Sequence, residues 1–216
     1  MAASVISSVA VTGSGTVTVP SGCTAVLLMW EAYGDGAFNG RNNLSLNGNA
    51  PDQVEDDDNG DGDHFGNAIW YHPSIGSQSF VLTFTSGVDE GPVGRLIYLQ
   101  DGNTESWGDY DWDAWGSQTG ALSFVLDTPN GAEDLVIAFD TRGGSAPANT
   151  TNWTSLGTQT NNSIGARAKS RYGIGSTMTV TAEQENFSTI TGVVIPPAAE
   201  GAQEDGDISA IPEITR

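Results

Sequence analysis

Short runs of alternating apolar and polar residues, separated by glycine-containing turns, constrain the fold of this chain more than any other feature. In the run Thr16 to Val19, the valines fall on one face of an extended segment and the threonines on the other. No long stretch shows a 3.6-residue apolar period, so we expect very little helix. The pattern predicts about twelve strands at intervals of about 8 to 20 residues, which is typical of a β-sandwich.

The most apolar of these runs is the segment Ala25 to Trp30. Its length and the flanking glycines predict a central strand that is buried on both faces. The 28 glycines are spread along the chain without a period and indicate many turns between short strands. The predicted strands cover residues 5–11, 16–19, 24–32, 44–48, 67–72, 80–85, 94–100, 121–126, 134–139, 164–172, 177–182 and 190–195.

The length and the charge of the chain limit what it can bind. Its 216 residues suit one all-β domain. Its 27 acidic and 7 basic residues give a net charge of −20, which phosphate backbones and anionic membranes would repel. We therefore expect neither nucleic acid nor a membrane as a partner. Such a surface favours solubility and suits a salty medium.

The N-terminus and the cysteine content bear on where the protein is made. The segment Met1 to Val5 has no positive charge and no long apolar stretch, so it does not resemble a signal peptide, and no run approaches the roughly 18 apolar residues of a membrane helix. Cys23 is the only cysteine, which rules out an intrachain disulfide and suggests a small core residue. Synthesis in a cytoplasm is expected.

A change of composition after Pro196-Pro197 predicts the end of the folded domain. We expect one sandwich domain over residues 1–197 and an extended acidic tail over residues 198–216. Ile208, Ile211 and Ile214 are spaced by three in this tail and are candidate anchors. Such a segment should be disordered alone, and a neighbouring subunit is the simplest partner to hold it.

Several segments together resemble a family of jelly-roll β-sandwich domains found in tailed-phage structural proteins and some bacterial surface proteins. The matching segments stand in order at Thr16 to Pro20, Val26 to Trp30, Leu44 to Gly48, Ala68 to Tyr71, Gly76 to Thr85, Leu135 to Ala138 leading into Thr141 to Gly144, and Phe187 to Pro197. The resemblance covers roughly residues 14 to 197 and depends on the order and spacing of strand patterns. It implies a single jelly-roll-like antiparallel sandwich, and it brings no catalytic motif with it.

An acidic run at residues 55–63 is a candidate calcium site. Asp57, Asn59, Asp61 and Asp63 alternate as oxygen ligands do in the first half of a calcium loop, and Gly62 permits a sharp turn. Ala68 stands where an EF-hand has its glutamate, so the run is not an EF-hand. The alternative is a solvated acidic loop without a metal.

A tryptophan-rich segment at residues 107–115 contains the candidate contact residues Trp107, Tyr110, Trp112 and Trp115. In an extended segment, Asp109, Asp111 and Asp113 share one face, while Tyr110 and Trp112 share the other. The rings could contact a protein neighbour, stack on a surface glycan, or fold back onto the sandwich.

Arg167, Lys169 and Arg171 form a basic stripe, because residues two apart on a strand share a face. The hypothesis is that this stripe binds the acidic loop of an identical neighbouring subunit. The alternative is pairing within the chain.

The sequence contains no nucleophile elbow, HExxH motif or phosphate loop, so we do not expect an enzyme. The leading interpretation is a non-enzymatic bacteriophage structural protein on the capsid exterior, of the decoration (cement) or spike type. Its expected partners are the major capsid protein, other virion proteins and further copies of itself, a trimer by analogy. The competing interpretation is a carbohydrate-binding module of an adhesin or of a tail-associated receptor-binding protein.

Overall fold

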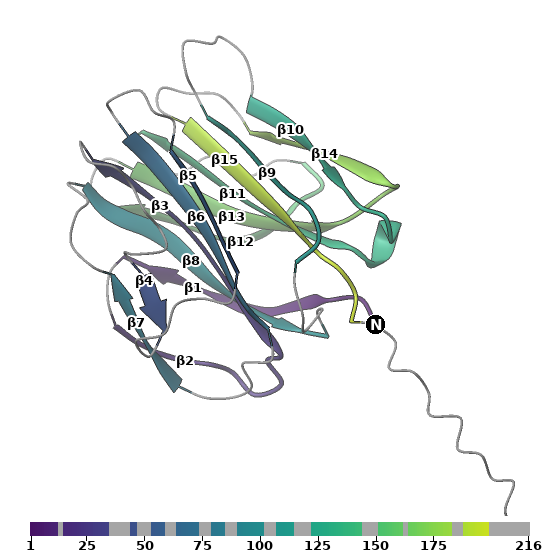
Figure 1. Ribbon diagram of the computed structural model, residues 1–216, viewed down its shortest axis with the longest axis horizontal. Helices are drawn as coiled ribbons and strands as arrows, with labels where there is room; N and C mark the ends of the chain where they lie inside the picture. The colour runs from purple at the N-terminus through teal and green to yellow at the C-terminus, as the bar shows by residue number, and fades with distance from the viewer. Residues whose placement is uncertain are drawn as a thin grey trace, which may run out of the picture.

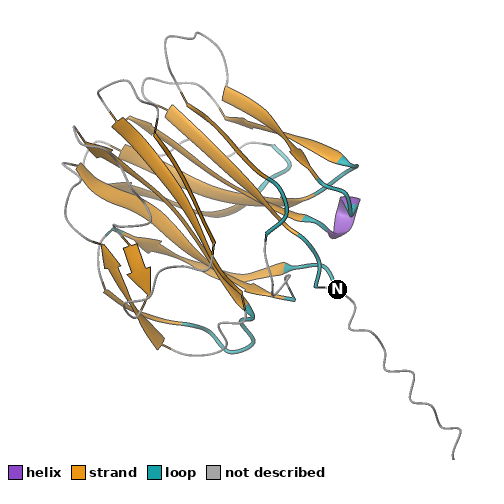
Figure 2. Cartoon of the chain, viewed as in Figure 1, coloured by secondary structure: helices purple, strands orange, loops and turns teal. Residues whose placement is uncertain are grey.

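The computed structural model describes the backbone of residues 1–12, 15–34, 44–46, 53–58, 64–73, 79–84, 90–101, 107–114, 122–143, 151–161, 164–182 and 188–198. Side chains are described in these ranges except at residues 31–34, 44–46, 53–58, 64–73, 79–84, 90–92, 114, 143, 161, 164 and 188. The described residues form fifteen strands and one short 3-10 turn, η1 (Gly131–Glu133). Strands dominate the described chain, as Figure 2 shows. The prediction of an all-β fold of antiparallel sheets is confirmed, and the jelly-roll connectivity stays a prediction.

Two large sheets of five strands each form the body of the molecule (Figure 1). The first consists, in spatial order, of β1 (Ser4–Val11), β8 (Glu90–Gln100), β3 (Ala25–Gly34), β6 (His64–Pro73) and β5 (Gln53–Asp58). The second consists of β12 (Thr154–Asn161), β13 (Ile164–Tyr172), β11 (Leu135–Gly143), β15 (Ser188–Ile195) and β9 (Tyr110–Ala114).

Two small sheets complete the described fold and lie at opposite ends of the molecule in Figure 1. Beside the first large sheet lies a three-stranded sheet of β2 (Gly15–Thr18), β7 (Ser79–Phe84) and β4 (Leu44–Leu46). Beyond the second large sheet lies a pair of β10 (Leu122–Asp127) and β14 (Thr177–Ala182). Each large sheet is therefore accompanied by a smaller sheet from the same half of the chain.

The two halves of the chain repeat one strand order. In the first half the order is β1-β8-β3-β6-β5 in the large sheet and β2-β7-β4 in the small one. In the second half it is β9-β15-β11-β13-β12 and β10-β14. The two orders correspond when β9, β10 and β11 are numbered one to three, the number four is left out, and β12 to β15 are numbered five to eight. The large sheet of the second half then has the order 1-8-3-6-5, and its small sheet has the order 2-7. No strand among the described residues of the second half takes the place of β4.

The core between the large sheets is built from both halves of the chain. Leu27, Met29 and Ile97 of the first sheet and Ile137 and Phe139 of the second are fully buried in it. Burying each such side chain stabilises the fold by about 1.5 to 3 kcal/mol. The two halves of the chain therefore share one hydrophobic core.

Strand β3 is buried on both faces, as its sequence predicts. Leu27 and Met29 enter the core between the large sheets, whereas the alternating residues Val26, Leu28 and Trp30 are equally buried but outside that cluster. Because neighbouring side chains on a strand point to opposite faces, these three side chains lie on the outer face of the first large sheet. Only a strand in the interior of a layered fold requires such a continuous apolar run.

A second core lies between the second large sheet and the pair β10–β14. Phe124, Leu126 and Val180 of the pair are buried with Val136 and Ala138 of β11. The alternate residues of β10 are exposed, which is the period-two pattern that its sequence shows. The pair β10–β14 therefore lies flat against the outer face of the second large sheet.

Cys23 is a small core residue, as its apolar surroundings suggest. It is 3 % exposed, and its thiol donates a hydrogen bond to the carbonyl of Ala25 at 3.0 Å. Burial raises the pKa of this thiol above its usual value. Because only the thiolate is a strong nucleophile, Cys23 is poorly suited to covalent chemistry.

Three strands were not predicted from the sequence, and each lies at the edge of a large sheet. They are β5, β9 and β12. Residues 55–58, expected in an acidic loop, lie in β5, and β9 lies in the tryptophan-rich segment, where no strand was predicted. An edge strand is covered on fewer sides than an interior strand, so it needs less apolar sequence.

No helix in the described part of the chain has the length and apolar character needed to cross a bilayer.

Candidate functional site

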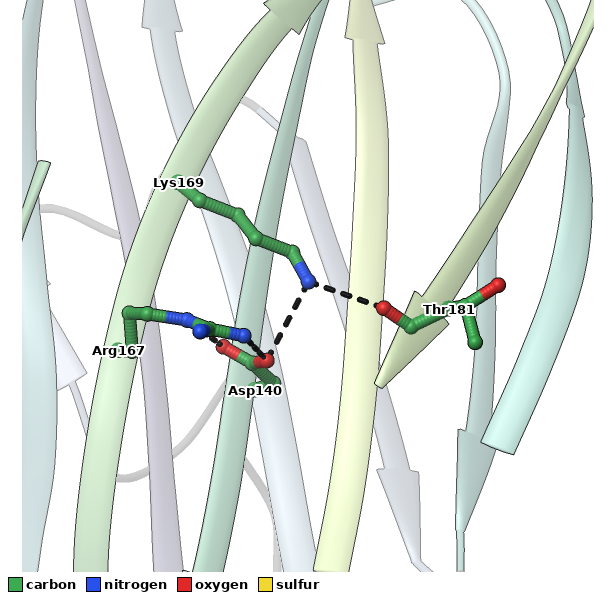
Figure 3. Close-up of polar contacts among 4 residues, drawn as sticks. All are labelled: Asp140, Arg167, Lys169 and Thr181. Atoms are coloured by element: carbon green, nitrogen blue, oxygen red, sulfur yellow. Dashed lines mark hydrogen bonds and ion pairs between the residues drawn. The ribbon is translucent and has the colours of Figure 1, made fainter. Parts of the chain in front are cut away.

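A cluster of charged side chains is buried between the second large sheet and the pair β10–β14 (Figure 3). Asp140 of β11 pairs in register with Arg167 of β13, and Lys169 follows on the same face of β13. Arg167 Nε donates to Asp140 Oδ1 at 3.0 Å, and its Nη2 donates to Oδ2. Lys169 Nζ lies 3.3 Å from Asp140 Oδ2. One carboxylate therefore holds two cations.

Lys169 also links this cluster to strand β14. Its Nζ donates to the backbone carbonyl of Thr181 at 3.0 Å and lies 5.0 Å from the centroid of the Trp153 ring. A cation over an indole ring is attracted by the negative face of the ring. The ammonium therefore connects the second large sheet, through Asp140, to the backbone of the sheet that covers it.

The burial of these groups corrects the hypothesis of an exposed basic stripe. Arg167 is 1 % exposed and Lys169 is 0 % exposed, so neither can reach a neighbouring subunit. Both bind Asp140 within the chain, which was the alternative, because a charge in a low-dielectric interior is tolerated only beside an opposite charge. Arg171 lies two residues further along β13 and is half-buried.

Carboxylates on and beside β9 cover the open edge of β10. Asp109 Oδ2 accepts a hydrogen bond from the backbone N–H of Asp127 at 2.6 Å, and Asp113 Oδ2 accepts one from Ser123 at 3.0 Å. On the other face of β9, Tyr110 packs against the central core. Asp109, Asp113 and Tyr110 therefore lie as the predicted alternation of acidic and aromatic faces requires. The aspartates occupy backbone donors that an added strand would otherwise use.

Replacing Asp109 and Asp113 together with alanine is expected to expose this edge. Each lost hydrogen bond should lower the free energy of unfolding by about 1 kcal/mol, and the bare edge should pair with other molecules during heating. Circular dichroism and light scattering along one temperature ramp would measure both effects. Asp127→Ala is the matched control. It removes an exposed acid on β10 but keeps the hydrogen bonds that Asp109 and Asp113 accept from the backbone of β10. Equal scattering from the two variants would contradict this role.

A second set of contacts ties the edge strands β1 and β12 together. Arg95 of β8 is 8 % exposed, and its Nη1 donates to the carbonyl of Thr158 at 3.3 Å while Nη2 donates to Ser8 Oγ at 3.3 Å. Ser8 Oγ donates to the carbonyl of Leu156. Burial lowers the pKa of Arg95 below its usual value. The guanidinium therefore joins the two large sheets at one side of the sandwich.

A groove beside this junction is lined by residues of both β1 and β12. It has a volume of about 460 Å³. Its lining residues are Ser4, Val5, Ile6, Ser7, Ser8, Leu135, Thr154, Ser155, Leu156, Ser170 and Tyr172. These described lining residues carry hydroxyl groups, aliphatic side chains and the ring of Tyr172, and none of them is an acid or a base.

The predicted aromatic contact residues are distributed differently from the expectation. Trp107 is 9 % exposed and belongs to the central core, so its ring folds back onto the sandwich, which was one of the alternatives. Tyr110 and Trp112 are half-buried on β9, and Trp115 lies outside the described residues. Only part of this set is available to a partner.

The predicted calcium ligands and tail anchors lie largely beyond the described part of the chain. Asp57 is in β5, where the backbone alone is described, and Asn59, Asp61 and Asp63 lie outside. Ile208, Ile211 and Ile214 also lie outside the described residues. Among the described residues, no three histidine, cysteine, aspartate or glutamate side chains come together as metal ligands would.

Comparison with known proteins gives no relative: no protein-family model, no curated protein and no solved structure matches this chain. The sheet order, the capped edges, the buried cluster and the groove are therefore the observations on which a function can be argued.

Proposed function

We propose that this protein is a non-enzymatic structural protein of a bacteriophage particle. It lies on the capsid exterior as a decoration or spike protein and binds neighbouring subunits. The observation that carries the proposal is the protection of the edge strands by polar and charged groups. Copies held at high density on a particle must not fuse through open sheet edges, and charged or covered edges prevent such fusion.

Each edge of the two large sheets has its own protection. Strands β1 and β12 are tied to each other through Ser8, and β5 carries the four acids of residues 55–58. Strand β9 is flanked by Asp109 and carries Asp111 and Asp113. A net charge of −20 adds repulsion between bodies. Such a body remains separate unless a dedicated contact holds it.

The buried charged groups support the same proposal, because they serve architecture. Asp140, Arg167 and Lys169 bind one another and the backbone of β14. Arg95 binds two edge strands. Charged groups used in this way rigidify a body that must keep its shape in an assembly.

The experiment is protein mass spectrometry on phage particles purified by density gradient from the source of the gene. The expected result is this chain in the particle band, at a copy number comparable to that of the major capsid protein or a fixed fraction of it. Recovery only in the soluble fraction would contradict the proposal. Analytical ultracentrifugation of the isolated 22.5 kDa chain would then test the expected trimer separately.

A further inference from the structure

We infer that the groove between β1 and β12 is a binding site for a neutral saccharide. This inference goes beyond the structural role proposed above and does not depend on it, because it stands on the shape and the chemistry of the groove alone.

The groove is a built feature of the junction between the two sheets. The edge strands are held together by the bonds from Ser8 to Leu156 and, at 3.2 Å, from Gln159 Nε2 to the carbonyl of Val11. Beside these bonds, residues 4–8 of β1 and 154–156 of β12 line a volume of about 460 Å³. This volume falls in the range of roughly 300 to 1,000 Å³ that small-molecule sites occupy.

An aromatic ring stands at the groove in a fixed position. The Tyr172 hydroxyl donates to the carbonyl of Ala3 at 2.9 Å, which orients the side chain, and the residue remains 42 % exposed. The C–H face of a sugar ring packs well against an aromatic ring, because both surfaces are flat and apolar. Val5, Ile6 and Leu156 extend the apolar part of the lining.

The polar part of the lining consists of hydroxyl groups. Hydroxyls from Ser4, Ser7, Thr154 and Ser155 can donate and accept hydrogen bonds, which matches the sugar hydroxyls that they would meet. The chain has 27 acids, but none of the described residues that line this groove is an acid or a base. A charged ligand would find no counter-charge in this lining, so the chemistry selects an uncharged, hydroxylated ligand.

An added peptide strand fits the same groove less well. A ladder needs regularly spaced N–H and C=O groups along an edge, and β1 has a bulge between Val5 and Ser7 that breaks this spacing. The bond from Ser8 to Leu156 limits the stretch of β1 that lines the groove ahead of it to residues 4–7, which is shorter than the usual strand of about five to six residues. A compact ligand is therefore favoured over an extended chain.

The test is a screen of the full chain on an array of neutral and acidic glycans. A titration with glucose, galactose, mannose, N-acetylglucosamine and their disaccharides follows, monitored by two-dimensional amide NMR. The expected result is selective binding of one neutral sugar type, with shifts confined to residues 4–8, 154–156 and 170–172. Tyr172→Ala should weaken binding about tenfold, because it removes the ring. Thr154→Val should weaken it about fivefold, because it removes one hydroxyl at constant shape.

Two control variants match these changes outside the groove. Thr160→Val makes the same chemical change on an exposed residue of the same strand, and Ile174→Ala removes a side chain that is 72 % exposed. Neither should alter the affinity. Binding of acidic glycans alone, no shift in the groove with any neutral sugar, or equal affinity in all four variants would overturn the inference. Groove shifts that depend only on protein concentration would assign the groove to a segment of a second copy and would also overturn it.

Discussion

Replacing Asp140 with alanine is expected to lower the free energy of unfolding by about 3 to 5 kcal/mol. Arg167 and Lys169 are both buried and both bind this carboxylate, so its removal leaves two cations in the interior without a counter-charge. In a chain of this size, 1 kcal/mol shifts the melting temperature by roughly 2 to 4 °C. We therefore expect the midpoint to fall by roughly 6 to 20 °C, as measured by urea and thermal unfolding at constant pH.

Two further variants separate the cluster from a general loss of charge. Asp111→Ala removes a half-buried aspartate of β9 whose Oδ1 accepts from its neighbour Trp112, and we expect a loss below about 1 kcal/mol. Replacing all three cluster residues by apolar ones, with Asp140→Leu, Arg167→Met and Lys169→Met, should recover most of the stability. Wild-type stability of Asp140→Ala would show that the cations do not need this carboxylate.

Replacing Gly157 with alanine is expected to cost about 2 to 4 kcal/mol, the second largest effect. Gly157 has a φ of +118°, a conformation that L side chains rarely adopt. A Cβ there would lie 2.3 Å from the Nη2 atom of Arg95. The substitution therefore strains the backbone of β12 and displaces the guanidinium that joins β8 to both edge strands. Chemical unfolding monitored by tryptophan fluorescence would measure the loss.

The control is Gly15→Ala in β2, because a Cβ at Gly15 meets no atom within 4 Å. We expect its stability to stay within about 1 kcal/mol of the wild type. A double-mutant cycle with Arg95→Met separates the two causes. If the clash with Arg95 contributes, Gly157→Ala should cost less in that background, and the remainder measures the backbone strain. Equal costs in both backgrounds would exclude the clash.

The repeated strand order describes how the two halves of the chain are arranged around one core. Each half of the chain places its own small sheet beside its own large sheet, and the two large sheets then face each other. Alternation of apolar residues cannot reveal such a repeat. It indicates that a segment is a strand and which of its faces is apolar, but not which strand lies beside it.

By itself, the sequence determined the class of the fold and its interior strands. Strands β3, β8, β11 and β15 lie where their apolar runs predict them, because an interior strand must bury side chains and its sequence records that need. The acidic and aromatic faces of β9 were also readable, since alternation is a local property of an extended backbone.

Only the tertiary structure decided three of the four edge strands of the large sheets, the pairing of the buried charges and the position of the groove. Strands β5, β9 and β12 form because neighbouring strands provide backbone hydrogen-bond partners. The polar sequences of these three strands do not indicate that such partners are present. Arg167 and Lys169 resemble surface residues until Asp140, 27 and 29 positions away, is placed beside them. A buried ion pair and a groove both depend on which residues of another strand lie nearby. A local run of residues does not contain that information.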